Sequence, residues 1–375
     1  MNRKKILFTF ITFLFFILLS LISIELFLRG YSKFNPTLFA PKDKKYDQFR
    51  ANPKAWINGF QLNSKGYHDE EFTVQKKDGV FRILAIGDSF TFGVVPYKDN
   101  FITLLQESLK EKNPSLEILN MGIPGTSVKE YLSLFVDEGL ELNPDMLLLN
   151  VYIGNDILET EKKEDSNLYT VRFFKYVNAV SKLKQSGSKP FVRLRGDNKE
   201  NSYDDNLKSM DDQAFYEVQK EMFIVYFDHK HILKYLNYKY NAMFKEFENI
   251  KRICDSKNIK LLVVLIPAEI QVDKNLQKII EPQLNNSSYK SVDTYDNLIR
   301  SINYTLPNTI IRKELSLQGI QYVDLLEPFQ EKALALRLYK PQDTHWGIVG
   351  NQFAAQILND FFLKKNIIPS VPTNK

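Results

Sequence analysis

The sequence predicts an α/β protein in which five strands form an open, mainly parallel sheet, preceded by one transmembrane helix. Two observations predict this class: short apolar runs alternate with amphipathic stretches, and most of the runs end in Gly or Pro. Continuous apolar runs are typical of strands that are covered on both faces. The predicted strands are residues 81–87, 116–122, 145–154, 259–267 and 320–325.

The first thirty residues form a separate element. Residues 6–24 carry no charge, and a helix of that length nearly crosses the hydrocarbon layer of a membrane. A signal peptide has a shorter apolar core and a small-residue cleavage site, and a buried core helix has a polar face. We therefore expect residues 1–29 to be an uncleaved anchor. We expect the N-terminus inside and the body outside the cytoplasmic membrane, since long domains are translocated largely regardless of charge.

Residues 30–55 hold prolines, lysines and scattered aromatics without a period, which predicts a linker. The main domain is expected over residues 56–370. It begins with a turn signal at residues 63–66, which predicts an edge hairpin between two short extended pieces. A charged insertion at about residues 159–225 is too long for a plain connection. It is either a lid over the carboxyl edge of the sheet or partly disordered, and we favour the lid.

Amphipathic stretches separate most of the strands. Helices are expected over residues 101–112, 127–142, 226–256 and 348–365. Strands that alternate with helices in this way imply right-handed crossovers and helices on both faces of the sheet. Ligands of such sheets bind at the carboxyl ends of the strands.

The composition argues against several partners. The 50 Lys and Arg and 45 Asp and Glu residues give a net charge of +5 without a broad basic field, so we expect no nucleic acid. Cys254 is the only cysteine, so no internal disulfide forms. His229 and His231 are two apart and would point to different faces of a helix, so we expect no metal and no cofactor. His68 beside Asp69 is interpreted as an exposed turn.

Polar residues suited to acyl transfer follow four of the predicted strands. Ser89 follows the first, Gly125 the second and Asn155 the third, and Asp343 and His345 follow the fifth. These strand ends share one edge of a parallel sheet, so the residues can converge. A serine at a strand-to-helix turn exposes its hydroxyl, the imidazole would take its proton, and the aspartate would hold the ring's tautomer. The N–H groups of the serine and the glycine, with the asparagine amide, would bind the oxyanion.

Each of these features alone has a simpler interpretation. A Gly-Asp-Ser run makes turns and helix N-caps, and Gly125 alone is a turn glycine. Asn155-Asp156 could cap one helix, and Asp343 could cap the last one. His345 could be a half-buried histidine beside Trp346. Their occurrence in chain order at four strand ends favours a combined site.

The segments GDSFTFG, NMGIPG, GND and DTHW resemble the conserved blocks of the SGNH/GDSL hydrolase superfamily, and LNSKGYHDEEF resembles a lead-in of its bacterial members. The resemblance runs from about residue 63 to residue 362. It implies a three-layer α/β/α, flavodoxin-like fold and serine-dependent hydrolysis or transfer of acyl groups, often acetyl esters on carbohydrates or longer chains on lipids. It also implies Ser89 as nucleophile, Gly125 and Asn155 as oxyanion donors, and His345 as base.

Two blocks depart from the pattern of the superfamily. The third usually reads G-x-N-D, but here Gly154 directly precedes Asn155. The last usually reads D-x-x-H, but Gln342 occupies that position and Asp343 lies two residues before His345. The D-x-H-W form resembles the branch that contains polysaccharide O-acetyltransferases of the alginate type. Hydrolysis and transfer therefore both stay open.

We expect a membrane-anchored, extracytoplasmic serine esterase that hydrolyses acyl esters, above all acetyl esters, of a cell-envelope carbohydrate or lipid through a Ser89-His345-Asp343 triad. One alternative is an O-acyltransferase that uses the same site on a glycan. Another is a non-catalytic binding module that retains the fold. The expected partners are the acylated substrate and the membrane, and the sequence leaves the acyl chain, its carrier and the oligomeric state open.

Overall fold

The computed structural model describes residues 3–35, 44–159, 168–174, 177, 200, 202–286 and 295–369. The chain divides into two compact units. The first comprises Met1–Asp43 and Lys163–Lys189, and the second comprises Lys44–Lys162 and Pro190–Lys375.

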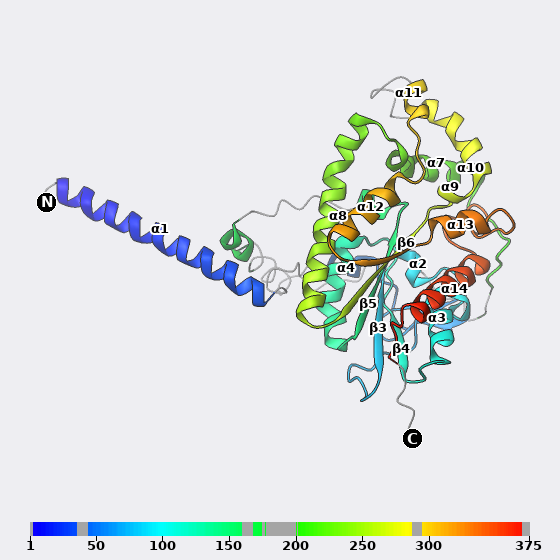
Figure 1. Ribbon diagram of the computed structural model, residues 1–375, viewed down its shortest axis with the longest axis horizontal. Helices are drawn as coiled ribbons and strands as arrows, with labels where there is room; N and C mark the ends of the chain where they lie inside the picture. Colours follow the sequence, from blue (N-terminus) through cyan, green and yellow to red (C-terminus); the bar gives the residue numbers. More distant parts are fainter. Residues whose placement is uncertain are drawn as a thin grey trace. The chain divides into compact units, whose positions relative to one another are not determined.

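The first unit contains the long helix α1, Arg3–Phe34. Its segment Arg3–Ser32 is long and apolar enough to cross a membrane, and Figure 1 shows α1 as one continuous helix. Near the end of the apolar run, the Glu25 carboxylate pairs with Arg29 and accepts hydrogen bonds from the backbone N–H groups of Tyr169 (3.0 Å) and Thr170 (2.9 Å). The helix therefore continues beyond residue 29, into the segment that the sequence assigned to a linker.

The second unit is built on five parallel strands in the order β4-β3-β5-β6-β7. They are β3 Phe81–Ile86, β4 Leu116–Asn120, β5 Met146–Tyr152, β6 Lys260–Ile266 and β7 Gln321–Asp324. Every residue of β3 and β5 is buried, as their continuous apolar sequences predict for central strands. The predicted parallel sheet is confirmed.

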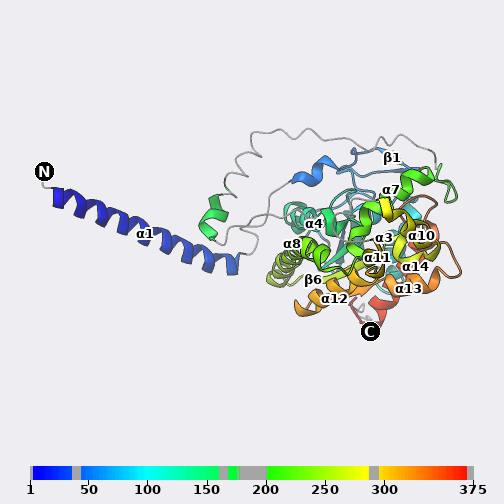
Figure 2. The same cartoon turned by 90° about the horizontal axis from the view of Figure 1, so that it is seen from above.

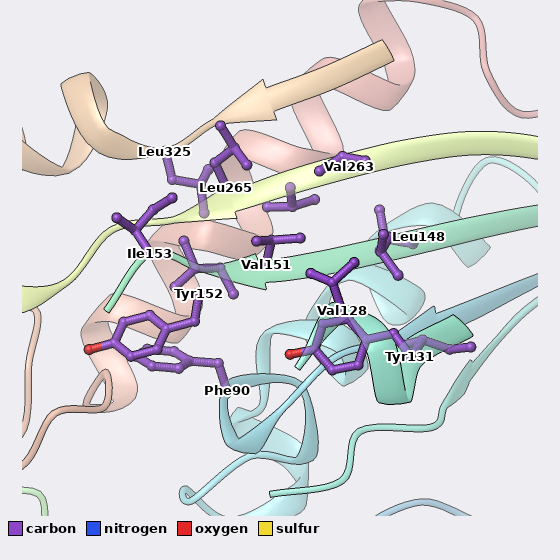
Figure 3. Packing of buried hydrophobic residues seen from close by; sticks show 14 of the residues in the cluster. Phe90, Val128, Tyr131, Leu148, Val151, Tyr152, Ile153, Val263, Leu265 and Leu325 are labelled. Atoms are coloured by element: carbon purple, nitrogen blue, oxygen red, sulfur yellow. The ribbon is translucent and has the colours of Figure 1, made fainter. Parts of the chain in front are cut away.

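Helices cover both faces of this sheet (Figures 1 and 2). One layer contains α4 Val128–Leu134, α8 Lys230–Ser256 and α12 Leu306–Leu317, and the other contains α3 Phe101–Lys110 and α14 Ile348–Lys364. Figure 3 shows Val128 and Tyr131 of α4 packed toward Leu148 and Val151 of β5. Further helical segments are η1 Lys44–Gln48, α2 Ser89–Phe92, η2 Tyr97–Asp99, η3 Phe135–Gly139, η4 Leu140–Leu142, α5 Asp156–Glu159, α7 Asp212–Met222, η5 Phe223–Tyr226, α9 Glu269–Val272, α10 Lys274–Ile280, η6 Glu281–Asn286, α11 Tyr295–Arg300 and α13 Leu326–Lys332.

The edge hairpin exists, but its predicted turn was wrong. Strands β1 Trp56–Ile57 and β2 Phe60–Gln61 pair antiparallel across Asn58-Gly59. Both turn residues have positive φ, 48° and 79°, which suits the Asn-Gly pair of a type I′ turn. At residues 63–66 the chain makes a separate turn, in which the Asn63 side chain accepts the backbone N–H groups of Lys65 and Tyr67.

The expected linker and the expected insertion both contribute residues to the hydrophobic core, which the sequence did not indicate. Within the expected linker, Tyr46 is fully buried in the hydrophobic core, and Arg50 pairs with Glu138 (2.6 Å). The expected insertion lies partly outside the described residues. Its described part from residue 202 onward carries α7 and η5, which bury Phe215 and Phe223 in the same core.

Gly122, at the carboxyl edge of the sheet, lies directly against α2, the helix that carries Ser89. A Cβ at Gly122, just after β4, would lie 2.7 Å from the backbone Cα of Phe92 in α2. Because that contact is to backbone, we expect Gly122→Ala to displace α2 and to lower the free energy of unfolding by about 1–3 kcal/mol. Chemical denaturation of the full chain in detergent measures this change. Gly30→Ala is the matched control, since its Cβ would meet nothing within 4 Å; equal stability of the two variants would contradict the prediction.

Candidate active site

Ser89 sits on a turn between a central strand and a short helix. Strand β3 ends at Ile86, and Ser89 is the first residue of α2. A Cβ at Gly87 would lie 2.9 Å from the Asn150 carbonyl oxygen, so the bend needs a glycine. The Asp88 carboxylate accepts the backbone N–H of Phe90 (2.9 Å) and caps α2. The half-buried serine thus lies beside β5, where the strand order reverses and ligands of such sheets bind.

The loop before α14 brings His345 to this serine. The Nε2 atom of His345 lies 2.7 Å from Ser89 Oγ, although the two residues are 256 positions apart. The Nδ1 atom lies 2.6 Å from Oδ1 of Asp343. With the Nδ1 proton donated to this carboxylate, Nε2 is free to accept the serine proton. The structure therefore brings three of the predicted site residues into one hydrogen-bonded chain.

Asp343 is bound on both of its oxygens. Its Oδ1 also accepts the backbone N–H of His345 (3.0 Å), and its Oδ2 accepts the hydroxyl of Ser209 (2.5 Å). Burial by itself raises the pKa of Asp343, but the bonds and charge of His345 and the bond from Ser209 outweigh it and lower that pKa to about 2. Gln342, at the position where the superfamily has its aspartate, has a positive φ of 43° and turns the chain just ahead of Asp343.

Gly125 and Asn155 lie outside the hydrogen-bonded series of Ser89, His345 and Asp343. Gly125 is exposed and has a positive φ of 70° in the loop after β4. The Asn155 side-chain amide donates to the carboxylate of Glu159 (3.1 Å). Among the described residues, no hydrogen bond links either residue to Ser89 or His345. Their role as oxyanion donors stays a prediction.

Three carboxyl groups near the serine have raised pKa values. Burial raises the pKa of Asp88 to about 6, against the opposing bond from Phe90 and charge of His345. Burial, and then the charges of Asp88 and Glu159, raise the pKa of Asp156 well above its usual range. Burial and Asp88 raise the pKa of Glu159 to about 7. Sequence reasoning treated Asp88 only as part of a bend and Asp156 only as a cap, because their proximity depends on the fold.

Asp156 is held by hydrogen bonds at the end of β5. The phenol of Tyr131 lies 3.0 Å from each of its carboxyl oxygens, and the backbone N–H of Tyr152 donates to it at 2.9 Å. A fourth carboxyl, Glu269, follows β6 at the same edge of the sheet. Burial, with the charges of Asp273 and Asp343, raises the pKa of Glu269 well above its usual range. No local pattern marks Glu269 in the sequence.

The other histidines are placed differently from their predictions. His68 is buried rather than exposed, and its Nδ1 lies 3.1 Å from the Phe92 carbonyl oxygen, which braces the end of α2. Burial lowers the pKa of His68 to about 4. His229 precedes α8 as its N-cap, and its ring lies 5.5 Å from that of His231 instead of on a different helix face. Within the part of the chain that the structure describes, no group of three or more His, Cys, Asp or Glu could hold a metal ion.

No protein-family model and no curated protein matches the chain. Among solved structures, the chain is similar to the acetyl xylan esterase AlAXEase, with 18% identity, a TM-score of 0.39, and coverage of 75% of this chain and 99% of that one. It is also similar to a catalytic mutant of Axe2, an acetylxylan esterase from Geobacillus stearothermophilus, with 12% identity, a TM-score of 0.39, and coverage of 80% and 100%. A lipase/acylhydrolase from Enterococcus faecalis matches with 11% identity, a TM-score of 0.38, and coverage of 79% and 100%. With these identities and TM-scores, the similarity says nothing about the chemistry of this chain. The conclusions about chemistry rest on the residues of the chain itself.

The buried Asp88 gives the fold a specific pH dependence. Its pKa of about 6 exceeds the ordinary value of 3.8, so the folded chain holds this proton more tightly than the unfolded chain. The resulting stability is present below pH 3.8 and is lost as the pH rises through 6. Asp88→Asn keeps the capping oxygen and does not titrate. We expect its stability relative to the native chain to rise by about 2 kcal/mol between pH 4 and pH 7, as measured by urea denaturation; a difference that is constant with pH contradicts the assignment.

Proposed function

We propose that this protein is a serine esterase that hydrolyses acyl esters. The observation that carries the proposal is the hydrogen-bonded chain from Ser89 Oγ through His345 to Asp343 at the carboxyl edge of the sheet. Its order and its two short links match the requirements for nucleophilic catalysis by serine. A non-catalytic binding module has no need of this arrangement, which argues against that alternative.

In the proposed reaction, Ser89 Oγ attacks the ester carbonyl while His345 Nε2 takes the hydroxyl proton. Asp343 stays anionic and stabilises the imidazolium, since the pKa of this carboxyl is lowered to about 2. His345 then returns the proton to the leaving alcohol, which leaves an acyl group on the serine. A water molecule, activated by the same imidazole, releases the acid and restores the hydroxyl.

The oxyanion of each tetrahedral intermediate would be bound by the backbone N–H groups of Ser89 and Gly125 and by the side chain of Asn155. The asparagine amide carries two N–H bonds. One is bound to Glu159, at 3.1 Å, which leaves the other for the substrate. Burial raises the pKa of Glu159 to about 7, which limits its negative charge beside a developing oxyanion.

The proposed setting is the outer side of the cytoplasmic membrane. Helix α1 is long and apolar enough to span it and would anchor the chain, with the catalytic unit in the extracytoplasmic or periplasmic space. The proposed substrate is an acylated, above all acetylated, carbohydrate or lipid of the cell envelope. The resemblance to the SGNH/GDSL superfamily supports this choice of acyl group and carrier.

A second candidate function is O-acyl transfer to a glycan through the same acyl-serine intermediate. One observation favours it: the residue that binds His345 Nδ1 is Asp343, two positions earlier, as in the D-x-H-W form. Transfer differs from hydrolysis only in the group that attacks the acyl-serine. A sugar hydroxyl would take the place of water.

The nucleophile is tested with the full chain in detergent and a chromogenic acetyl ester. We expect Ser89→Ala to lower kcat/KM by at least about 10³-fold, because the acyl-serine cannot form. Ser108→Ala is the matched control, since the hydroxyl of this serine donates to the Leu104 carbonyl of its own helix. Equal rates for the native chain and Ser89→Ala would remove both enzymatic proposals.

Adding an acceptor separates hydrolysis from transfer. With an acetyl donor and an excess of a soluble glycan, a hydrolase releases acetate and leaves the mass of the glycan unchanged. A transferase adds one acetyl mass to the glycan, and Ser89→Ala abolishes that product. Mass spectrometry of the glycan distinguishes the two, and we expect acetate alone.

A further inference from the structure

The segment Tyr203–Ser209, here called the strap, lies against the loop that carries Asp343 and His345. Four hydrogen bonds join it to the part of the loop before Gln342. The Arg337 guanidinium donates to the Asp205 carbonyl (3.0 Å) and to Asn206 Oδ1 (2.8 Å), Lys340 Nζ donates to the Leu207 carbonyl (2.7 Å), and the Ser209 N–H donates to the Pro341 carbonyl (3.2 Å). These bonds join residues more than 130 positions apart.

The strap also fixes the far end of the same loop. The Asp205 carboxylate accepts the backbone N–H of Ile348 (3.1 Å), the first residue of α14, and the phenol of Tyr203 (2.7 Å). A Cβ at Gly347 would fall 2.6 Å from this carboxylate, so the N-cap of α14 must be a glycine for the approach to occur. A carboxylate at a helix N-terminus is favourable, and this one ties the strap to the end of the loop.

Between these attachments, the strap presents one hydroxyl to the proposed triad. Ser209 Oγ donates to Asp343 Oδ2 at 2.5 Å and accepts from Lys340 Nζ at 2.8 Å. The other oxygen of Asp343 is occupied by the backbone and the ring of His345. The carboxylate is therefore held from both sides, and charge-assisted bonds of this kind are directional.

The hydrogen bond from Ser209 to Asp343 has a particular use because Asp343 and His345 belong to the same D-x-H turn. Asp343 and His345 share one tight turn, so the bonds between their own groups do not tie the Asp343 carboxylate to any other segment. The bond from Ser209 comes from a separate segment and provides that tie.

We propose that Ser209 is a positioning residue for the reaction proposed above: through Asp343 it holds the imidazole of His345 toward Ser89. This inference rests on the proposed function. The Ser209 side chain is exposed, so water can replace part of the bond, and the expected effect is moderate.

The test compares Ser209→Ala with Ser209→Thr in the full chain. We expect Ser209→Ala to lower kcat roughly 3- to 10-fold with KM within about twofold, because a lost hydrogen bond of this kind changes geometry and not substrate binding. Ser209→Thr keeps the hydroxyl and should restore kcat. Lys208→Ala is the control, because this neighbour pairs with Asp212 and not with the loop. A kcat for Ser209→Ala equal to that of the native chain, or no recovery in Ser209→Thr, would overturn the inference.

A second readout does not depend on turnover. The proton between His345 Nδ1 and Asp343 should give a far-downfield proton NMR resonance, assigned by its absence in His345→Gln. We expect the resonance to shift or broaden in Ser209→Ala and to return in Ser209→Thr. If Ser89→Ala keeps full activity, the proposed function fails while this resonance still reports on Ser209. If Ser89→Ala is inactive but the resonance is unchanged in Ser209→Ala, the positioning role alone fails.

Discussion

The packing of Trp346 determines where the two distant parts of the site meet. Its indole is 1% exposed and lies among three phenylalanine rings, with centroid distances of 5.0 Å to Phe90, 5.6 Å to Phe101 and 4.9 Å to Phe329. Phe90 directly follows Ser89, and Trp346 directly follows His345. The hydrophobic contact between Phe90 and Trp346 therefore sets the hydrogen bond between Ser89 and His345. Buried aromatic pairs carry much of the energy of a core, so the site depends on packing as much as on its own hydrogen bonds.

The carboxyl groups around the site have different pKa values because their environments differ. Asp343 receives hydrogen bonds on both oxygens, and its pKa is lowered to about 2. Asp88 is fully buried with one capping bond, and its pKa is raised to about 6. Carboxyl groups whose pKa values are made different by their environments can take different roles. Here Asp343 is ionised at any pH well above about 2, whereas Asp88 loses its proton only near pH 6.

The strands and the Ser89, His345 and Asp343 contacts were predictable because each has a local signal. Buried central strands require continuous apolar runs, and polar residues at the ends of parallel strands share one edge. Ser209 had no such signal: it lies in a polar insertion without a period, and its partner is 134 residues away. Asn58-Gly59 did carry a strong hairpin signal, but the neighbouring run at residues 63–66 carried another, and only the pairing of β1 with β2 distinguishes them. The burial of His68 depends on the position of α2, which no short segment encodes.

The separation of 256 residues between Ser89 and His345 also has a consequence for synthesis of the chain. A ribosome makes the turn that carries Ser89 well before the loop with Asp343 and His345. A nascent chain that ends before residue 343 therefore holds Ser89 without the imidazole that hydrogen-bonds to it. Long-range contacts of this kind form late, after the local helices and the neighbouring strands. The complete arrangement can be assembled only once residue 345 has been made, long after the apolar helix α1.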